Sequence, residues 1–314
     1  MASAGCGSNG GNQDNAGPDH KITLVSSITG SSFLGVTAGL EQKIFQKHGL
    51  DLEVIKVKSS AEAAAAVASG QADLAAMLPE GVVAVTSAGS KMTMVGNLLN
   101  QVQYRLETSP AITSAKDLIG KKIGLVGPGS GEEILVRAYL DSHGVAPSQV
   151  TFVATGTMAA KYAAVTTEQV DGTMLVPPFD IKAEAAGLNP LSVLGDDFPD
   201  MPAQVYASNE RKLSTKTDSI KKFLAASTES TQWILDHPED ATKILSEDSK
   251  VSLDDARASY ERAKAAYSPD GSINEDGLNR WLELSKKFSS LSNIPSASEL
   301  YSPDYLPAPA TASK

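Results

Sequence analysis

The chain has 314 residues, of which 41% are hydrophobic and 20% are charged, and its formal net charge is −10 at pH 7. This length allows two lobes with separate cores, and the acidic balance argues against nucleic acid as a partner because phosphate binding needs a basic face. No apolar run approaches the ~18 residues of a membrane span. The single cysteine, Cys6, excludes an internal disulfide.

The first 19 residues are rich in Gly, Ser, Asn and Asp, and Cys6 stands directly after Ala4-Gly5. This context resembles the end of a bacterial lipoprotein signal, in which the cysteine is lipidated and becomes the mature N-terminus, although Ser3 stands where Leu is usual. The alternative is an irregular tail with a chance cysteine. We expect residues 1–19 to be a flexible tether with a lipid on Cys6, and the protein to be extracytoplasmic, in the periplasm or at the cell surface.

From Lys21 the sequence alternates short apolar runs with segments of helical periodicity. The strands are expected at 21–25, 52–57, 72–78, 92–99, 122–126, 150–154, 172–176 and 204–208. The helices are expected at 33–45, 61–69, 82–88, 132–142, 158–166, 218–235 and 275–288. This alternation predicts an α/β fold with parallel-type sheets and helices on both faces.

Two passages of the chain carry the same signals in the same order, 95 to 98 residues apart. The matching pairs are His48 and His143, Gln71 and Gln169, Asp73 and Asp171, and Pro79 and Pro177. A repeat of this kind predicts two similar structural units. Two α/β units that face each other form a cleft, and a cleft is where small ligands bind.

Four phrases carry a family resemblance: GLDLEV (49–54), ASGQADL (68–74), AKDLIGKKIG (115–124) and WILDHPEDA (233–241). With these phrases in this order, the chain resembles the solute-binding proteins of ABC importers for nitrate, aliphatic sulfonates, taurine and thiamine pyrimidine precursors. The resemblance covers about residues 21–291. One departure is Glu168, where the family often has Gly, and the change concerns the end of a helix.

The resemblance implies a two-lobed periplasmic-binding-protein fold of type II with two hinge strands. Lobe 1 would comprise residues 20–102 and 205–314, and lobe 2 residues 103–204. The lobes would close on a small-molecule ligand by hinge motion, and a membrane permease with its ATPase would recognise the closed form of a monomer.

In open parallel sheets, ligands bind beyond the carboxyl ends of the strands, at helix N-termini. The candidate residues are therefore Thr29, Ser31, Phe33, Ser59, Ser60 and Glu80 in the first passage, and Gly129, Ser130, Gly131, Glu132, Thr157, Met158, Pro178 and Phe179 in the second. The glycines around Ser130 let backbone amides approach a ligand, or form a plain tight turn. Phe33 and Phe179 can stack on a flat ligand, and Phe33 can equally be a core residue.

The charges in these loops favour a ligand with N–H, O–H or cationic groups. The loops hold Glu62, Glu80, Glu132 and Asp180, with Lys161 as the one cation and no arginine. A nitrate or sulfonate site would gain much from a bidentate arginine. Glu80 is the strongest single candidate, and its alternative is a solvated carboxylate at a helix start. We expect a pyrimidine or amine-type vitamin precursor as ligand, with an aliphatic sulfonate, taurine or another small anion as the alternative.

Three rival functions are weaker. The run from Gly127 to Gly131 has the wrong spacing for a dinucleotide site. The chain is also similar to thiamine pyrimidine synthases, but the resemblance implies a cysteine-rich iron-binding segment there, and no cysteine follows Cys6. The histidines are scattered without metal or nucleophile–base spacing. We expect no catalytic residue, metal site or cofactor, and a receptor ectodomain or orphan binding protein stays open as the third rival.

Overall fold

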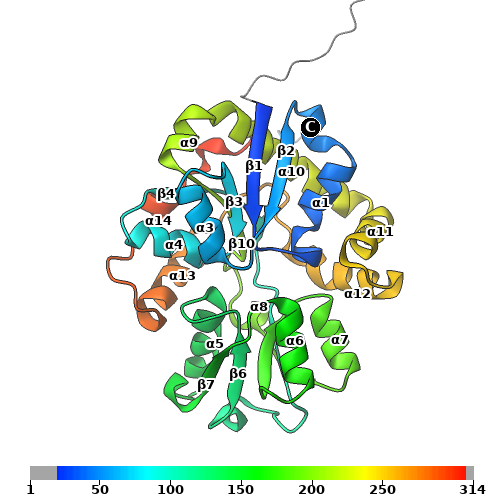
Figure 1. Cartoon of the computed structure of the whole chain (residues 1–314), viewed down its shortest axis with the longest axis vertical. Coiled ribbons are helices and arrows are strands. Elements are labelled where there is room, and N and C mark those ends of the chain that lie inside the picture. Colours follow the sequence, from blue (N-terminus) through cyan, green and yellow to red (C-terminus); the bar gives the residue numbers. More distant parts are fainter. Residues whose placement is uncertain (1–19, 309–314) are drawn as a thin grey trace, which may run out of the picture.

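The computed structural model describes residues 20–308, and these form two five-stranded sheets placed end to end along the long axis of the molecule (Figure 1). In order across the first sheet lie β2 (Asp51–Lys56), β1 (Lys21–Ser26), β3 (Leu74–Met77), β10 (Gln204–Asn209) and β4 (Met92–Leu99). In order across the second lie β7 (Thr151–Ala154), β6 (Lys122–Leu125), β8 (Gly172–Leu175), β5 (Arg105–Thr108) and β9 (Asn189–Val193). We call each sheet with the helices packed on it a lobe, the first sheet belonging to lobe 1.

Both sheets are mixed, and they share one topology. The first three strands of each order run parallel, while β10 is antiparallel to β3 and β4, and β5 is antiparallel to β8 and β9. In each sheet the antiparallel strand follows a crossing of the chain from the other lobe. The sequence patterns do not predict β5 or β9, because Arg105 and Glu107 interrupt the apolar pattern of a central strand.

Helices cover both faces of each sheet. Those of lobe 1 are α1 (Leu34–Glu41), α2 (Ile44–Lys47), α3 (Ser60–Ala68), α4 (Pro79–Ser87), α9 (Glu210–Thr215), α10 (Thr217–Asp236), α11 (Pro238–Ser249), α12 (Leu253–Ala263), α13 (Glu275–Phe288) and α14 (Ala297–Leu300). Those of lobe 2 are α5 (Gly131–Ser142), α6 (Met158–Thr166), α7 (Phe179–Ala185) and α8 (Leu194–Asp197). The helix expected at 33–45 is divided between α1 and α2 at Lys43, which has a φ of 57°. No helix within residues 20–308 is both long and apolar enough to cross a membrane.

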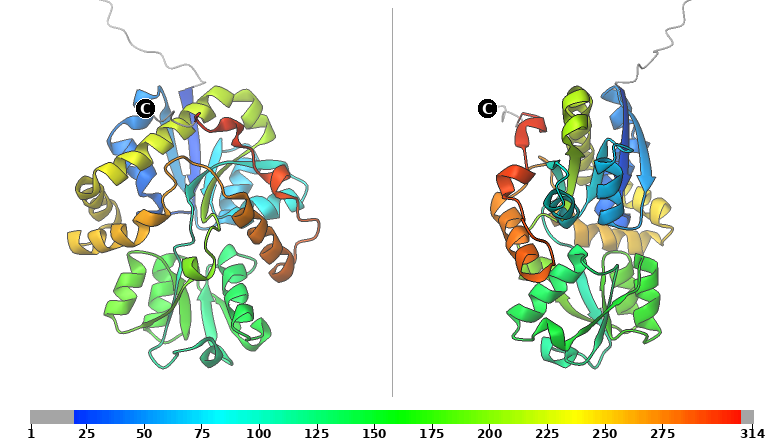
Figure 2. Two further views of the ribbon diagram at one scale, coloured as in Figure 1. Left: turned by 180° about the vertical axis from the view of Figure 1, so that it is seen from behind. Right: turned by 60° about the vertical axis from the view of Figure 1, so that its left-hand side comes forward.

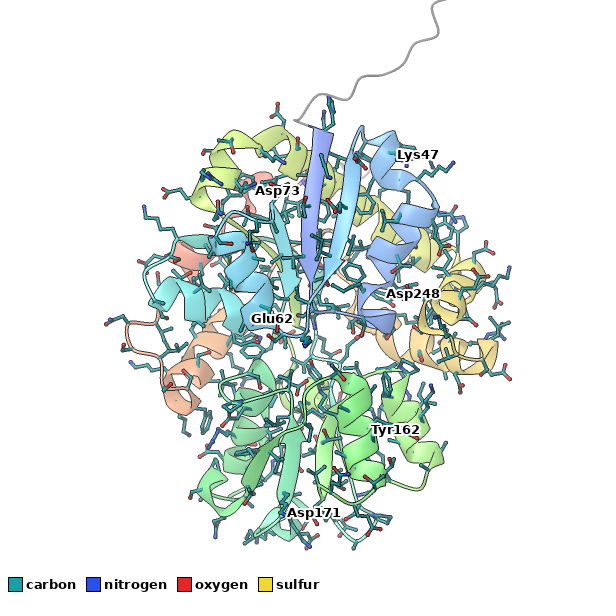
Figure 3. All side chains as sticks on the ribbon, viewed as in Figure 1. Lys47, Glu62, Asp73, Tyr162, Asp171 and Asp248 are labelled. Carbon is teal, nitrogen blue, oxygen red and sulfur yellow. The ribbon has the colours of Figure 1, made fainter. Side chains whose placement is uncertain are left out.

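The repeated aspartates do the same structural work in both lobes. Asp73 accepts a hydrogen bond from the amide of Thr23 at 3.0 Å, and its own amide donates to the Thr23 carbonyl at 2.9 Å. Asp171 makes the same pair of hydrogen bonds with Lys122, at 2.8 Å and 2.8 Å. Figure 3 shows both aspartates at the outer ends of the molecule, away from the junction of the lobes. These aspartates therefore fasten neighbouring strands and do not bind ligand.

Two chain crossings connect the lobes, between β4 and β5 and between α8 and β10. They are bonded to each other: the amide of Leu194 donates to the carbonyl of Tyr104 at 2.9 Å, and Gln101 Nε2 donates to the carbonyl of Gly195 at 2.9 Å. Trp281 of α13 donates from Nε1 to the carbonyl of Pro202 at 2.7 Å. Figure 2 shows α13 alongside this junction, where it also contacts α5 of lobe 2.

The lobe boundaries expected from the sequence remain a prediction. The first sheet takes its strands from residues 21–99 and 204–209, and the second from residues 105–193. We therefore place the boundaries within the two crossings. The tether expected at residues 1–19, with Cys6, lies outside the described residues, as does the end of the chain from residue 309.

Candidate ligand-binding site

A cavity of about 880 Å³ lies between the two lobes. Its wall is built from the loops that follow β1, β2 and β3 in lobe 1 and β6, β7 and β8 in lobe 2, so it lies where the carboxyl ends of six parallel strands meet. Helices α3 to α7 begin at or beside this wall. The volume is in the range of pockets that enclose a small organic molecule.

Most of the residues expected from the sequence come together here. From lobe 1 the cavity is lined by Thr29, Ser59, Ser60 and Glu80, and from lobe 2 by Gly129, Ser130, Glu132, Thr157, Met158, Pro178 and Phe179.

Ser31, Phe33 and Gly131 are not part of the cavity surface. Ser31 is fully buried, and its carbonyl accepts a hydrogen bond from the hydroxyl of Tyr267 at 2.9 Å. Phe33 is a core residue, and the Nζ of Lys56 lies over its ring at 3.4 Å. Gly131 lies against the Glu80 carboxylate, where the ligand would not reach it. The Ser31–Phe33 turn therefore supports the wall from behind.

Three of the lining hydroxyls cap helices. Ser59 accepts from the amide of Glu62 at 3.2 Å, Ser130 from that of Glu133 at 3.3 Å, and Thr157 from that of Ala160 at 3.4 Å. Each cap satisfies one free amide at a helix start and directs the positive end of α3, α5 or α6 at the cavity. The hydroxyl hydrogens are still available to donate to a ligand.

Glu80 is the exceptional group of the cavity. Its side chain is 6% exposed, and Oε2 is buried with no hydrogen-bond partner. Burial raises the pKa of Glu80 to about 7; the Ser60 hydroxyl and the Gly131 amide oppose this rise, and the charge of Glu132 adds to it. A Cβ atom on Gly131 would lie 2.7 Å from Oε2, so the glycine at the start of α5 permits this contact across the cleft. Glu80 can accept a hydrogen bond when ionised and donate one when protonated.

Glu132 and Lys161 form a closed ion pair on the lobe 2 side. They are 3% and 1% exposed, with 2.5 Å between Lys161 Nζ and Glu132 Oε1, and Glu132 Oε2 accepts from the amide of Val126 at 3.0 Å. The one cation expected from the sequence is thus already neutralised. Tyr104 lies beside this pair, and burial together with the charges of Glu132 and Glu80 raises the pKa of its hydroxyl well above the usual value.

Sequence reasoning missed most of the positive charge of the cavity. Lys56, Lys58 and Lys182 line it, together with Tyr104 and Asp248. Burial lowers the pKa of Lys56 to about 8, and its Nζ donates to the carbonyl of Ile28 at 2.9 Å. Lys56 is the last residue of β2, inside the strand expected at 52–57, so a search confined to the loop from Ser59 did not include it.

Two carboxylates counted from the sequence do not face the cavity. Glu62 accepts from the amide of Lys58 at 2.9 Å, and Asp180 is fully buried against Arg262 at 2.7 Å. The lining residues within 20–308 thus include Glu80, Glu132 and Asp248 as acids against four lysines. The excess of carboxylates over cations expected from the sequence is wrong, because Glu62 and Asp180 bond elsewhere and three lysines that the search missed line the cavity.

A flat aromatic face completes the lobe 2 side. Phe179 begins α7 and lies 5.9 Å from Tyr162, between ring centroids, while the Nζ of Lys182 lies 5.6 Å from the Phe179 ring. None of the histidines in the described part of the chain lines the cavity, and no group of three or more His, Cys, Asp or Glu there can hold a metal ion. The cavity residues are therefore suited to hydrogen bonding and stacking.

Sequence comparison connects the chain to one family. The family described as NMT1/THI5 like matches residues 31–241. A 4-amino-5-hydroxymethyl-2-methylpyrimidine phosphate synthase of Candida albicans (strain WO-1) is 24% identical over 212 residues, which is 63% of this chain and 62% of that protein. The synthase THI11 of Saccharomyces cerevisiae is 24% identical over 230 residues, 67% of this chain and 64% of that protein. The chain thus matches less than two thirds of the length of these relatives.

Solved structures confirm the expected fold. The alkanesulfonate-binding protein SsuA of Xanthomonas axonopodis pv. citri, bound to MOPS, superimposes with a TM-score of 0.74 at 15% identity over 90% of this chain and 99% of that one. The periplasmic nitrate-binding protein NrtA of Synechocystis PCC 6803 gives a TM-score of 0.75 at 15% identity over 91% of this chain and 87% of that one. The two lobes have the fold of periplasmic binding proteins.

Proposed function

The chain belongs to the NMT1/THI5-like family, and from this premise we propose that it is the extracytoplasmic solute-binding protein of an ABC importer. It captures a small polar ligand in the cavity between the lobes, closes by hinge movement at the two crossings, and delivers the ligand to a permease driven by an ATPase. The cavity at the carboxyl ends of both sheets supports this role. So do neighbours whose titles name binding proteins for alkanesulfonates and nitrate.

The observation that carries the ligand proposal is the buried Oε2 of Glu80 without a partner. A buried polar group of this kind costs free energy until something bonds to it. An aminopyrimidine carries an amino group that can donate to the Oε2 of Glu80, and this charge-assisted hydrogen bond is strongest when the carboxyl group, with its pKa about 7, is ionised. Phe179 offers a ring on which the heterocycle can stack. The ligand is therefore a pyrimidine or amine-type vitamin precursor.

A second class of ligand, small anions, is favoured by the positive groups of the cavity. Lys56, Lys58 and Lys182 line the cavity, and capped helix starts direct positive partial charge into it. An aliphatic sulfonate, taurine or another small anion would use these groups. No arginine lines the cavity within the described residues, so such an anion would lack a bidentate partner.

The proposed role is binding without catalysis. The curated relatives are named synthases, but the lining residues within 20–308 include no histidine and no cysteine, and the described residues contain no group of three or more His, Cys, Asp or Glu that could hold a metal ion. We also propose that a lipid on Cys6 tethers the protein to the membrane, because the cysteine follows Ala4-Gly5 and precedes a Gly- and Asn-rich segment.

Native mass spectrometry of the full chain, expressed in a bacterial host, tests the function. A solute-binding protein retains a stoichiometric small molecule that is released on denaturation with its mass unchanged. The labelled molecule added back should rebind unchanged over hours. Conversion of that molecule to a product of different mass by the purified protein would contradict the proposal.

A further inference from the structure

A cluster of charged side chains lies outside the cavity, where α12 of lobe 1 meets α7 and β5 of lobe 2. Arg262 of α12 donates from Nη1 to Asp180 at 2.7 Å and binds Glu184 through both terminal nitrogens, at 2.9 Å and 2.8 Å. Arg105 of β5 lies on the other side of these acids, with its Nε 3.2 Å from Glu184 and 3.9 Å from Asp180. Two acids of α7 are thus held between one arginine from each lobe.

When all of its acids are ionised, the cluster is one positive charge short. Glu107 of β5 lies 3.5 Å from Arg105, its side chain is fully buried, and neither of its oxygens has a hydrogen-bond partner. Three carboxylates therefore share two guanidinium groups. Arg262 is the member that comes from lobe 1, so separation of the lobes would leave the three acids with Arg105 alone. Charge balance in the cluster consequently favours the arrangement in which the lobes are together.

Helix α7 connects this cluster to the ligand. Phe179 and Lys182 of α7 line the cavity, whereas Asp180 and Glu184 of the same helix bind Arg262. One helix therefore presents its aromatic ring to the ligand and its carboxylates to the other lobe. Whatever fixes α7 against lobe 1 also fixes the position of the Phe179 ring over the cavity.

We propose that Arg262 is a positioning residue for ligand capture, which latches α7 to lobe 1 when the lobes close and so brings Phe179 over the ligand. The latch contributes to closure through ion pairs remote from the cavity, and it does not touch the ligand. This inference rests on the proposed function only for its effect on affinity, since the latch itself concerns the lobes without ligand.

Arg257 provides a matched control. It lies on the same helix, and its Nη2 donates to Glu239 at 2.6 Å, but this pair is exposed and both partners belong to lobe 1. Replacement of Arg257 by glutamine removes an arginine–carboxylate pair from α12 without affecting any contact between the lobes. Glu184→Gln tests the same latch from lobe 2, at a partly exposed site where the substitution is easily accommodated.

The decisive experiment measures the distance between the lobes in the full chain. Spin labels on Lys47→Cys in lobe 1 and Lys116→Cys in lobe 2, both exposed positions, are placed in a Cys6→Ser background. In ligand-free protein at pH 8, Arg262→Gln and Glu184→Gln should move the distance distribution away from that of the parent, while Arg257→Gln should leave it unchanged. Arg262→Lys should give an intermediate result, because it keeps the charge but loses the bidentate geometry.

Titration with 4-amino-5-hydroxymethyl-2-methylpyrimidine then reports the effect on affinity. Arg262→Gln should weaken binding at least about fivefold, the lower end of the usual range for coupling between sites, and Arg257→Gln should not. An unchanged distance distribution in both latch variants overturns the latch. A changed distribution with no binding of this probe even by the parent retains the latch and contradicts the proposed ligand instead.

Discussion

The two lobes begin a cleft-facing helix with an acid in its first turn, and they use that acid in opposite ways. In α4 of lobe 1, Glu80 faces the cavity and its Oε2 has no partner. In α7 of lobe 2, Asp180 turns away from the cavity to bind Arg262, and Phe179 takes the place at the wall. The carboxylate that pairs within the protein stabilises the arrangement of the lobes, and the unpaired one is left for the ligand.

The same contrast appears in the other charges of the cavity. Lobe 2 contains the closed pair of Glu132 and Lys161, in which both carboxylate oxygens accept hydrogen bonds inside the protein. Lobe 1 presents Glu80, whose Oε2 is buried without a hydrogen-bond partner, and the partly desolvated Lys56. The repeated fold therefore presents an acid that is already paired in lobe 2 and an acid that is unpaired in lobe 1.

Removal of one partner from the closed pair should have the largest effect. Lys161→Met leaves Glu132 buried without its cation, and we expect a loss of about 3–5 kcal/mol in the free energy of unfolding, measured by urea denaturation. The double variant Glu132→Gln with Lys161→Met should recover most of this loss, because no buried charge remains. A Lys161→Met variant as stable as the parent would contradict the pairing of Glu132 with Lys161.

Neutralisation of Glu80, the acid whose Oε2 has no partner, should instead raise the free energy of unfolding. The pKa of Glu80 is raised in the folded protein to about 7, above the ~4.5 of an unfolded chain, so its ionisation destabilises the fold progressively as pH rises from about 4.5 to about 7 and by a constant amount above that. Glu80→Gln should therefore be more stable than the parent at pH 8, by up to about 3 kcal/mol, with no difference at pH 4. Thermal unfolding at both pH values measures this, and equal stability at pH 8 would refute the unpaired state of Glu80.

The contact of Gly131 with Glu80 across the cleft leaves no room for an added side-chain atom. Gly131→Ala places a Cβ 2.7 Å from Glu80 Oε2, and we expect ligand affinity to fall by about 1–2 kcal/mol through this overlap. Gly127→Ala is the control, because it also lines the cavity but its Cβ would meet no atom within 4 Å. Calorimetry of both variants checks the prediction, which fails if the two behave alike.

The smallest expected effect concerns the turn after α3 in lobe 1 and the matching turn after α6 in lobe 2. Gly70 ends α3 with a φ of 82°, and at the matching position after α6 Glu168 has a φ of 58°. Side chains cost about 1 kcal/mol in this left-handed region, so Glu168→Gly should raise the free energy of unfolding by about 0.5–1 kcal/mol and Gly70→Ala should lower it. Changes of the same sign in both variants, measured by urea denaturation, would show that the two turns are not equivalent.

The sequence predicted the architecture well, for physical reasons that act locally. Strand and helix periodicity depend on neighbours in the chain, and Gly70 follows the helix expected at 61–69 with a φ of 82°. The strand β5 could not be predicted, because Arg105 pairs with Glu184 of α7 and Glu107 is buried beside Arg105, and neither contact can be seen in the order of the chain.

Within the site, the loops were predictable but the directions of their side chains were not. Glu80 and Asp180 look equivalent in sequence, and the rotation of their helices decides which one reaches the cavity. Lys56 was missed because a lysine at the end of a half-exposed strand gives no sign that it folds over Phe33. Charge counting along the chain therefore identified the key acid but not the balance of charge around it.

We propose above all that Glu80 accepts a hydrogen bond from a donor group of the ligand. Calorimetric titration of the full chain with 4-amino-5-hydroxymethyl-2-methylpyrimidine, and with taurine, between pH 6 and pH 8 tests it most directly. Binding of the pyrimidine should strengthen as Glu80 ionises through about pH 7, Glu80→Gln should bind it more weakly and with a smaller dependence on pH, and taurine should show no comparable binding. Tight binding of taurine that is unchanged by Glu80→Gln, with none of the pyrimidine, would contradict it.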